Sequence, residues 1–269
     1  MMRMVVLTIL LSVVSTLTAQ QQPKTEQERE GAKIYNQAVE KFSAGEYAAS
    51  IPLFLTADSL IGATLLVDRL QLRYALGVAH LKTSEPDRAL EYFEWVAAQD
   101  STYPYIYLQA AESAQSAKQP AKALKYYRKA LESAQDAEKP VILSNIGELL
   151  FRRGDLDGAL KNCNQAIALS PAPGYYLLRG RIYDKLAGRI DHADESTFDF
   201  EEAIRNHSLT EEQMLEAVDL RQKALDDYRL ASRDEKLAQT AKMHTERSNA
   251  ILENNRAIIS EIRYQRENP

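Results

Sequence analysis

Small and apolar residues recur along the chain at three- and four-residue intervals, with polar residues between them. In the recurring ladder, a small residue is followed twelve places later by Ala or Ser, four places after that by an aromatic or medium-sized residue, and three places later by a small or apolar one. Four copies occur: Ala38-Ser50-Phe54-Ala57, Gly77-Ala89-Phe93-Val96, Ala111-Ala123-Tyr127-Ala130 and Gly147-Ala159-Cys163-Ala166. Residues three and four apart share one face of a helix, so the ladder predicts pairs of helices that pack through small side chains.

Residues typical of turns separate the two predicted helices of each copy. Gly and Pro at these places are typical of a helix end followed by a new helix start. The predicted turns are Gly45-Glu46-Tyr47, Ser84-Glu85-Pro86, Lys118-Gln119-Pro120 and Gly154-Asp155-Leu156.

This pattern resembles the tetratricopeptide repeat (TPR), a helix-turn-helix unit of about 34 residues. Placed on that unit, the copies start near Gly31, Leu70, Pro104, Pro140 and Pro173. The resemblance implies an all-α fold in which helix hairpins stack into a right-handed superhelix, a TPR α-solenoid. Stacking is required because a single hairpin cannot bury its apolar face alone.

The fifth unit departs from the pattern after its first helix. Residues 187–196 stand where the usual turn would be, and we interpret them as an insertion. The second helix of this unit would restart at Phe200 and Ala203, with His207 in the place that aromatic residues hold in earlier units. The register therefore assigns residues 31–207 to TPR-like repeats and leaves the completeness of the fifth repeat open.

Residues 208–269 predict two long helices, roughly over 209–232 and 236–263, because apolar residues keep a helical spacing there without Gly or an internal Pro. Their closely mixed charges indicate solvated faces. We expect these helices to cap the array, because the end of a repeat array needs a polar outer face. A coiled-coil-like extension through which the chain self-associates is the alternative that stays open.

The first twenty residues have the pattern of a secretory signal peptide. Arg3 precedes an apolar run over residues 5–17, and small residues follow up to a cleavage site expected near Ala19. The run is shorter than the roughly 20 residues that span a bilayer. We therefore expect cleavage of residues 1–20, a polar linker over 21–30, and an exported protein that is periplasmic or secreted.

Charge narrows the class of partner. The chain has 269 residues, with 33 Lys and Arg against 38 Asp and Glu, a formal net charge of -5. That balance lacks the broad positive field that binds a phosphate backbone. We expect no nucleic-acid partner, and any membrane contact to be indirect.

No pattern in the sequence predicts catalysis. The four histidines lack metal-ligand spacing, the glycines do not form a phosphate-binding loop, and the acidic residues 191–195 lack the spacing of a calcium loop. Cys163, the single cysteine, lies in an apolar helical pattern and is expected to be buried. We expect no catalytic residue, cofactor or metal; an enzyme that uses residues 187–196 is the weakest alternative.

The resemblance implies that the first helix of each unit lines a concave groove. The groove candidates for partner binding are Tyr35, Phe42, Tyr74, Lys82, Glu112, Gln115, Glu148, Arg152, Arg181 and Lys185. The set is aromatic towards its start and basic towards its end, which suits a polypeptide with apolar anchors and an acidic end. Packing of the aromatic residues between helices is the alternative reading.

These expectations combine into one functional hypothesis. The chain would be a non-catalytic exported TPR scaffold or adaptor that binds a protein or peptide partner in its groove, in cell-envelope assembly, secretion or surface organisation. The alternative is a structural homo-oligomer that assembles through the C-terminal helices.

Overall fold

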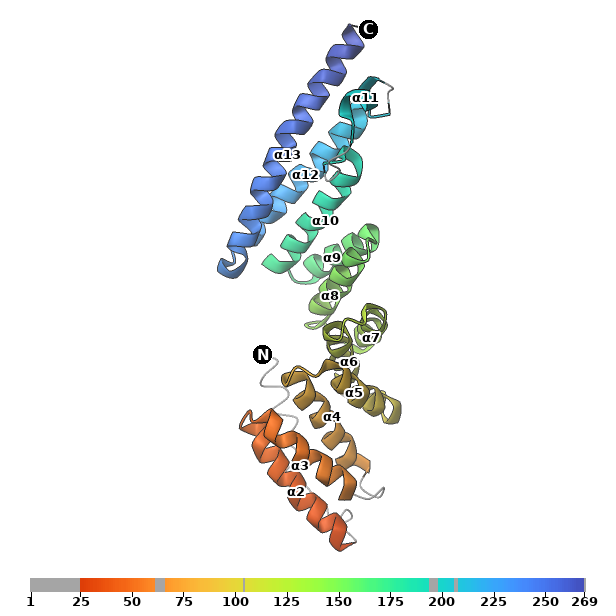
Figure 1. Ribbon diagram of the computed structural model, residues 1–269, viewed down its shortest axis with the longest axis vertical. Coiled ribbons are helices and arrows are strands. Elements are labelled where there is room, and N and C mark those ends of the chain that lie inside the picture. The colour runs from red at the N-terminus through yellow and green to blue at the C-terminus, as the bar shows by residue number, and fades with distance from the viewer. Residues whose placement is uncertain (1–24, 61–65, 104, 194–197, 206–207, 269) are drawn as a thin grey trace. The chain divides into compact units, whose positions relative to one another are not determined.

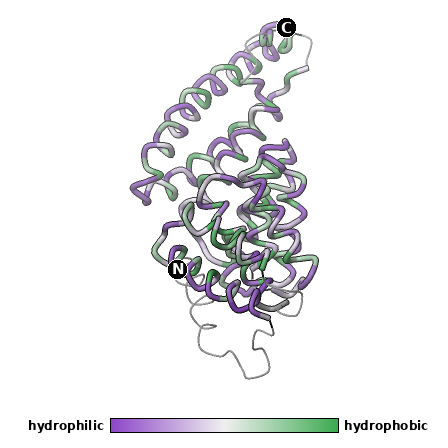
Figure 2. The backbone as a smooth tube through the Cα atoms, turned by 60° about the horizontal axis from the view of Figure 1, so that its bottom comes forward, coloured by the Kyte–Doolittle hydropathy of each residue, from purple (hydrophilic) through white to green (hydrophobic). Residues whose placement is uncertain are grey.

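The computed structural model describes residues 25–60, 66–103, 105–193, 198–205 and 208–268, and every regular element in them is an α-helix (Figure 1). The predicted all-α array of helix pairs followed by long C-terminal helices is confirmed. The chain divides into two compact units, the first ending at Glu132 and the second beginning at Ser133. Apolar and polar stretches alternate along the helices (Figure 2), as expected of elements that bury one face.

The N-terminal unit consists of three successive helix pairs. Their bounds are α2 (Glu26–Ser43) with α3 (Tyr47–Leu60), α4 (Leu66–Lys82) with α5 (Pro86–Gln99), and α6 (Ile106–Ser116) with α7 (Pro120–Ser133). The ladder residues meet inside the pairs: a β-carbon at Gly77 on α4 would lie 2.7 Å from the ring of Phe93 on α5. Glycine is therefore needed for this close approach of the two helices.

The C-terminal unit contains a further pair, then three long helices and one short one. Their bounds are α8 (Lys139–Arg152), α9 (Leu156–Leu169), α10 (Pro173–Asp191), α11 (Phe200–Arg205), α12 (Glu211–Ala231) and α13 (Glu235–Glu267). Helix α10 packs against α9 and α12, and α13 packs against both α12 and α10.

The four predicted turns lie between paired helices, and each contains one residue with a positive φ. The φ values are 80° at Gly45, 64° at Ser84, 58° at Lys118 and 80° at Gly154. In the first turn, the amide of Glu46 donates to the carbonyl of Lys41 at 2.9 Å. The equivalent bond occurs in the other three turns, so each first helix ends in the same left-handed cap.

The fifth hairpin is completed by α12, which corrects the sequence-based assignment to Phe200 and Ala203. A β-carbon at Gly180 on α10 would lie 2.6 Å from the ring of Tyr228 on α12, as at the Gly77 contact. Ala224, Tyr228 and Ala231 repeat the spacing of the second half of the ladder, and all three are fully buried. The short α11 is an excursion between the two helices of this hairpin, and His207 lies outside the described residues.

The predicted insertion over residues 187–196 begins later than expected and extends further, to the start of α12 at Glu211. Helix α10 continues to Asp191, and its C-cap residue His192 is left-handed, with φ 51°. The small residues Ala187 and Gly188 are buried, which lets the helix continue in close packing where a turn was expected. Residues 194–197 lie outside the described part of the chain.

The N-terminal boundary differs from the predicted linker. The signal-peptide prediction concerns residues that lie outside the described ones. Helix α2 begins at Glu26 because Thr25 and Glu28 form a capping box, each side chain accepting from the other's backbone amide. Residues 26–30 are therefore helical. In the described ranges, no helix is both long enough and apolar enough to cross a membrane.

Candidate partner-binding site

The predicted aromatic residues of the N-terminal unit pack between helices. Phe42 is 4% exposed and its ring lies 6.1 Å from that of Phe54, centroid to centroid. Tyr74 is 3% exposed and packs edge-on against Phe93 at 5.5 Å. Tyr35 is half-buried, 5.8 Å from Phe54. Burial of Phe42 and Tyr74 agrees with the packing alternative and leaves little of their surface for a partner.

The polar candidates of this unit lie on α4 and α6. Lys82 is exposed, whereas Glu112 is half-buried. Burial raises the pKa of Glu112, and the positive charge of Lys82 acts in the opposite direction. Gln115 is occupied within the fold, because its side-chain oxygen accepts from the hydroxyl of Tyr127 at 2.9 Å.

The candidates of the C-terminal unit come together. Glu148 on α8 accepts from Arg152 Nε at 2.8 Å and from Arg181 Nη1 of α10 at 3.2 Å. The guanidinium of Arg181 also lies 4.7 Å from the ring centroid of Phe151. Arg181 is thus held by a carboxylate and an aromatic face, an arrangement in which a guanidinium loses little freedom when it binds. Lys185 lies one turn further along α10 and is exposed.

Arg181 and Lys185 line a pocket of about 140 Å³ among α8, α10, α12 and α13. The pocket is lined by Phe151, Arg181, Asp184, Lys185, Arg221, Tyr228, His244 and Arg247. Four of these described lining residues are cationic and one is a carboxylate. Two of the four cations are paired with carboxylates, Arg181 with Glu148 and Arg221 with Asp191.

The positive charges around the pocket also act on the pKa of His244, which is lowered. Burial lowers it most, and the positive charges of Arg181 and Arg247 lower it further, while Asp184 acts in the opposite direction. A neutral His244 offers a ring nitrogen for hydrogen bonding.

The described residues contain no metal-binding cluster, and their one cysteine is buried. No three His, Cys, Asp or Glu side chains among them could hold a metal ion together. Cys163 is fully buried, as expected, and its Sγ lies 3.1 Å from the carbonyl oxygen of Tyr175. Burial raises the pKa of this thiol to about 12, so the nucleophilic thiolate is suppressed.

The repeat region matches the family model of the tetratricopeptide repeat over residues 74–140 and again over residues 108–176. The two matches together cover residues 74–176, and the helix-pair fold extends beyond them.

Three solved structures show the same fold. YrrB, whose structure is described as a TPR protein with an unusual peptide-binding site, is 18% identical, with a TM-score of 0.53 over 78% of this chain and 90% of that one. A MamA structure is 17% identical, with a TM-score of 0.52 over 80% and 95% of the two chains. MamA from Desulfovibrio magneticus RS-1, from residue 41 of that protein to its end, is 13% identical, with a TM-score of 0.51 over 61% and 88%. No curated protein matches the chain by sequence.

A buried polar network closes the floor of the pocket and was not foreseen from the sequence. Asp184 on α10 accepts from the hydroxyl of Tyr228 on α12 at 2.5 Å and from Ser248 on α13 at 2.8 Å. Arg221 Nη1 lies 3.3 Å from the same carboxylate. These donors from α12 and α13 hold the carboxylate of Asp184, the one carboxylate among the described lining residues of the pocket.

Asp191 and Arg221 form the second half of this network. Arg221 donates from Nε at 2.7 Å and from Nη2 at 2.9 Å to the two oxygens of Asp191, and Asn255 of α13 donates to the same carboxylate at 2.8 Å. Asp191 is 0% and Arg221 2% exposed. The network ties α10, α12 and α13 together in one register, because a shifted helix would leave a buried charge unpaired.

Of the candidates predicted from the repeat register, Arg181 and Lys185 line this pocket, Arg152 does not, and the lining residues His244 and Arg247 were not among the candidates. Both belong to α13, which follows the last recognised repeat. The available signal was their three-residue spacing, which places them on neighbouring positions of one helix face, although that spacing is common in any helix.

Proposed function

We propose that the chain is a non-catalytic TPR scaffold that holds a polypeptide partner by seating an acidic side chain of it in the pocket of the C-terminal unit. The observation that supports this most directly is the convergence of Arg181, Lys185 and Arg247 on one concave site. A carboxylate binds best where several cationic donors are already positioned.

The pocket is preorganised for such a ligand. Arg181 is held by Glu148 and Phe151, and Asp184 is occupied by Tyr228, Ser248 and Arg221. Binding then costs little side-chain ordering. The peptide-binding site named for YrrB is consistent with a peptide ligand, and the likeness itself concerns only the fold.

We further propose that the protein acts after export, in the periplasm or outside the cell, in envelope assembly, secretion or surface organisation. Residues 1–20 support export by their basic start and short apolar run. Cell fractionation followed by N-terminal sequencing tests this: we expect a chain that starts near residue 20 in the exported fraction. A full-length chain that stays in the cytoplasm would contradict export.

Cross-linked pull-down with charge-reversed variants tests the binding role. In the double variant Arg181→Glu and Lys185→Glu, the pocket becomes acidic, and we expect it to lose the partner recovered by the unmodified chain. The matched control is Lys223→Glu with Arg229→Glu, an equal charge change at exposed sites of α12. Equal recovery by both double variants would refute the pocket as the binding site.

A further inference from the structure

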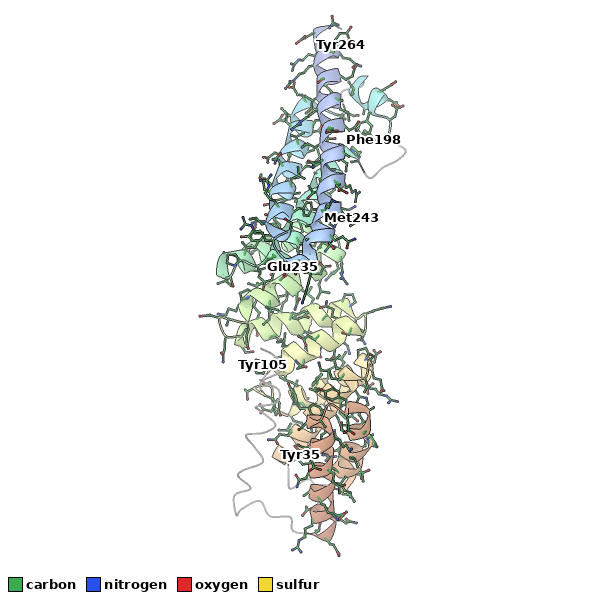
Figure 3. All side chains as sticks on the ribbon, turned by 90° about the vertical axis from the view of Figure 1, so that its left-hand side faces the viewer. Tyr35, Tyr105, Phe198, Glu235, Met243 and Tyr264 are labelled. Carbon is green, nitrogen blue, oxygen red and sulfur yellow. The ribbon has the colours of Figure 1, made fainter. Side chains whose placement is uncertain are left out.

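The outermost face of α13 carries an exposed stripe with a seven-residue repeat. Met243, Ala250, Ala257 and Tyr264 follow one another at intervals of seven, and all four are exposed. Met243 is 59% and Tyr264 63% exposed, and they lie towards opposite ends of the helix (Figure 3). Seven residues are close to two helical turns, so the four side chains form one line.

This stripe points away from the packing of its own chain. The buried residues of α13 face α10 and α12 and include Ala241, Ser248, Leu252, Asn255 and Ile259. The two large side chains of the stripe, Met243 and Tyr264, gain nothing from that packing, and exposed residues of this kind in line with small ones can mark a helix that meets another helix.

The charged residues that flank the stripe would pair favourably with those of an antiparallel copy of α13. When the sequence from 242 to 267 is aligned with its own reverse, each basic residue beside the stripe falls opposite an acidic one. The matched pairs are Lys242 with Glu267, Glu246 with Arg263, Arg247 with Glu261, and Glu253 with Arg256. The numbers of each pair add to nearly the same total, so all four pairs share one centre of symmetry, next to Asn254.

We propose that α13 is a self-association surface that pairs with α13 of a second copy of this chain, antiparallel about a two-fold axis near Asn254. In this arrangement Met243 packs on Tyr264 of the second copy, and Ala250 packs on Ala257. The two alanines let the helix axes approach closely at the centre, and the bulky residues close the ends.

Charge decides between the two possible directions of pairing. An antiparallel pair brings each flanking charge next to an opposite one and, by symmetry, forms each of the four matches twice. A parallel pair would place each stripe residue beside its own copy and would form none of the four matches, because the members of each matched pair lie at different heights along the helix. The surface therefore fits an antiparallel second copy.

Association is expected to be weak and salt-dependent. Lys242 already lies 3.7 Å from Glu246, and Arg263 donates to Glu211 at 2.8 Å within the chain. Pairing between copies exchanges one set of exposed ion pairs for another, and such pairs each contribute little and are screened by salt. We expect dissociation constants on the order of ten to a few hundred micromolar.

Disulfide trapping of the full chain tests the geometry. Asn254→Cys lies at the proposed two-fold axis, so oxidation should give a covalent dimer. Met243→Cys is the matched control, because its own counterpart would lie about 30 Å away along an antiparallel pair. Cys163, the one native cysteine, is fully buried and should not react. Cross-linking of Met243→Cys as fast as Asn254→Cys, or of neither variant, would overturn the proposal.

Charge exchange tests the same pairing without cysteine. Glu253→Arg and Arg256→Glu each place like charges together, and each should weaken association at least fivefold in sedimentation equilibrium. The double variant Glu253→Arg with Arg256→Glu restores opposite charges across the axis and should recover the affinity of the unmodified chain. A double variant as weak as the two single ones, or a chain that stays monomeric at several hundred micromolar, would contradict it. Arg247 belongs to both the pocket and the matched pairs and is left unchanged, whereas Arg181→Glu and Lys185→Glu lie on α10 and should leave association unchanged, so this test is separate from that of partner binding.

Discussion

Gly180 on α10 lies directly against the ring of Tyr228 on α12, so that a β-carbon at residue 180 would be 2.6 Å from Cε1 of the tyrosine. The same relationship joins Gly77 to Phe93 in the second hairpin, at 2.7 Å. The fifth hairpin therefore has the internal contact of the earlier ones, although its two partners are much further apart in the sequence.

Replacing Gly180 by Ala should destabilise the C-terminal unit by about 1–3 kcal/mol, because the added methyl group forces the ring of Tyr228 or the helix backbone to move. Gly174→Ala is the matched control, since a β-carbon there meets nothing within 4 Å. That control should be neutral or slightly stabilising, as Ala is the better helix former. Urea unfolding followed by circular dichroism measures both, and equal effects would show that α12 does not close the hairpin.

Much of this architecture follows from local spacing. Each of the first four ladders spans a fixed nineteen residues, and the turn residues lie at the same offset in every copy. Local patterns of this kind predict helices and their pairing well, because both contacts and turns are short-range. The four turns and the helix pairs were predicted correctly for this reason.

The fifth hairpin was missed because its ladder is interrupted. In the second copy the partner of Gly77 is Phe93, sixteen residues later, whereas the partner of Gly180 is Tyr228, forty-eight residues later. The expected offset from Gly180 leads to Ser196, well before α12. The ladder spacing of Ala224, Tyr228 and Ala231 was present in the sequence but lay outside that window.

The site was only partly predictable for a related reason. Arg181 follows from its place in the repeat, but His244 and Arg247 depend on how α13 is rotated against α12. The buried hydrogen bonds from Arg221 and Asn255 to Asp191 fix the rotation of α13 about its own axis. The sequence spacing of these residues does not indicate that they pair, because they lie on three separate helices.

Replacing Arg221 by Met should cost about 3–5 kcal/mol of unfolding free energy, because it leaves the fully buried carboxylate of Asp191 without its cation. The double variant Arg221→Met with Asp191→Leu should recover most of that loss, because no charge then stays buried. Arg229→Met is the control, since its ion pair with Asp226 is exposed and should change stability by less than about 0.5 kcal/mol. If the double variant is as unstable as the single one, Arg221 stabilises the fold by more than neutralising the buried charge of Asp191.

The free energy of unfolding should fall as the pH is lowered below about 6.5, the usual pKa of a His side chain. The folded-state pKa of His244 is lowered, chiefly by burial and then by Arg181, so in the window between the two pKa values the unfolded chain binds more protons than the folded one. The contribution of a neutral His244 is therefore present above the unfolded pKa and is lost as the pH falls. Burial lowers the pKa of His80 in the N-terminal unit as well.

Urea unfolding at a series of pH values between 7.5 and 5 separates the two histidines. His244→Gln should flatten the pH dependence of the C-terminal unit's transition, and His80→Gln that of the N-terminal unit. If His244→Gln leaves the dependence as steep as in the unmodified chain, His244 is not the group that titrates there.

Cys163 should resist thiol reagents in the folded protein and react fully in denaturant. The thiol is completely buried between α9 and α10, and its pKa is raised to about 12 by burial, so at pH 8 neither access nor thiolate is available. Because the folded pKa lies above the unfolded one, this group's contribution to stability is fully present below about pH 9 and is lost as the pH rises from there towards 12. Labelling with a chromogenic disulfide at pH 8 measures the effect, with the exposed Asn254→Cys as the positive control that should react within the mixing time. Rapid labelling of Cys163 in the folded chain would mean that the fourth and fifth hairpins separate readily, and the close packing argued for this part of the array would then be wrong.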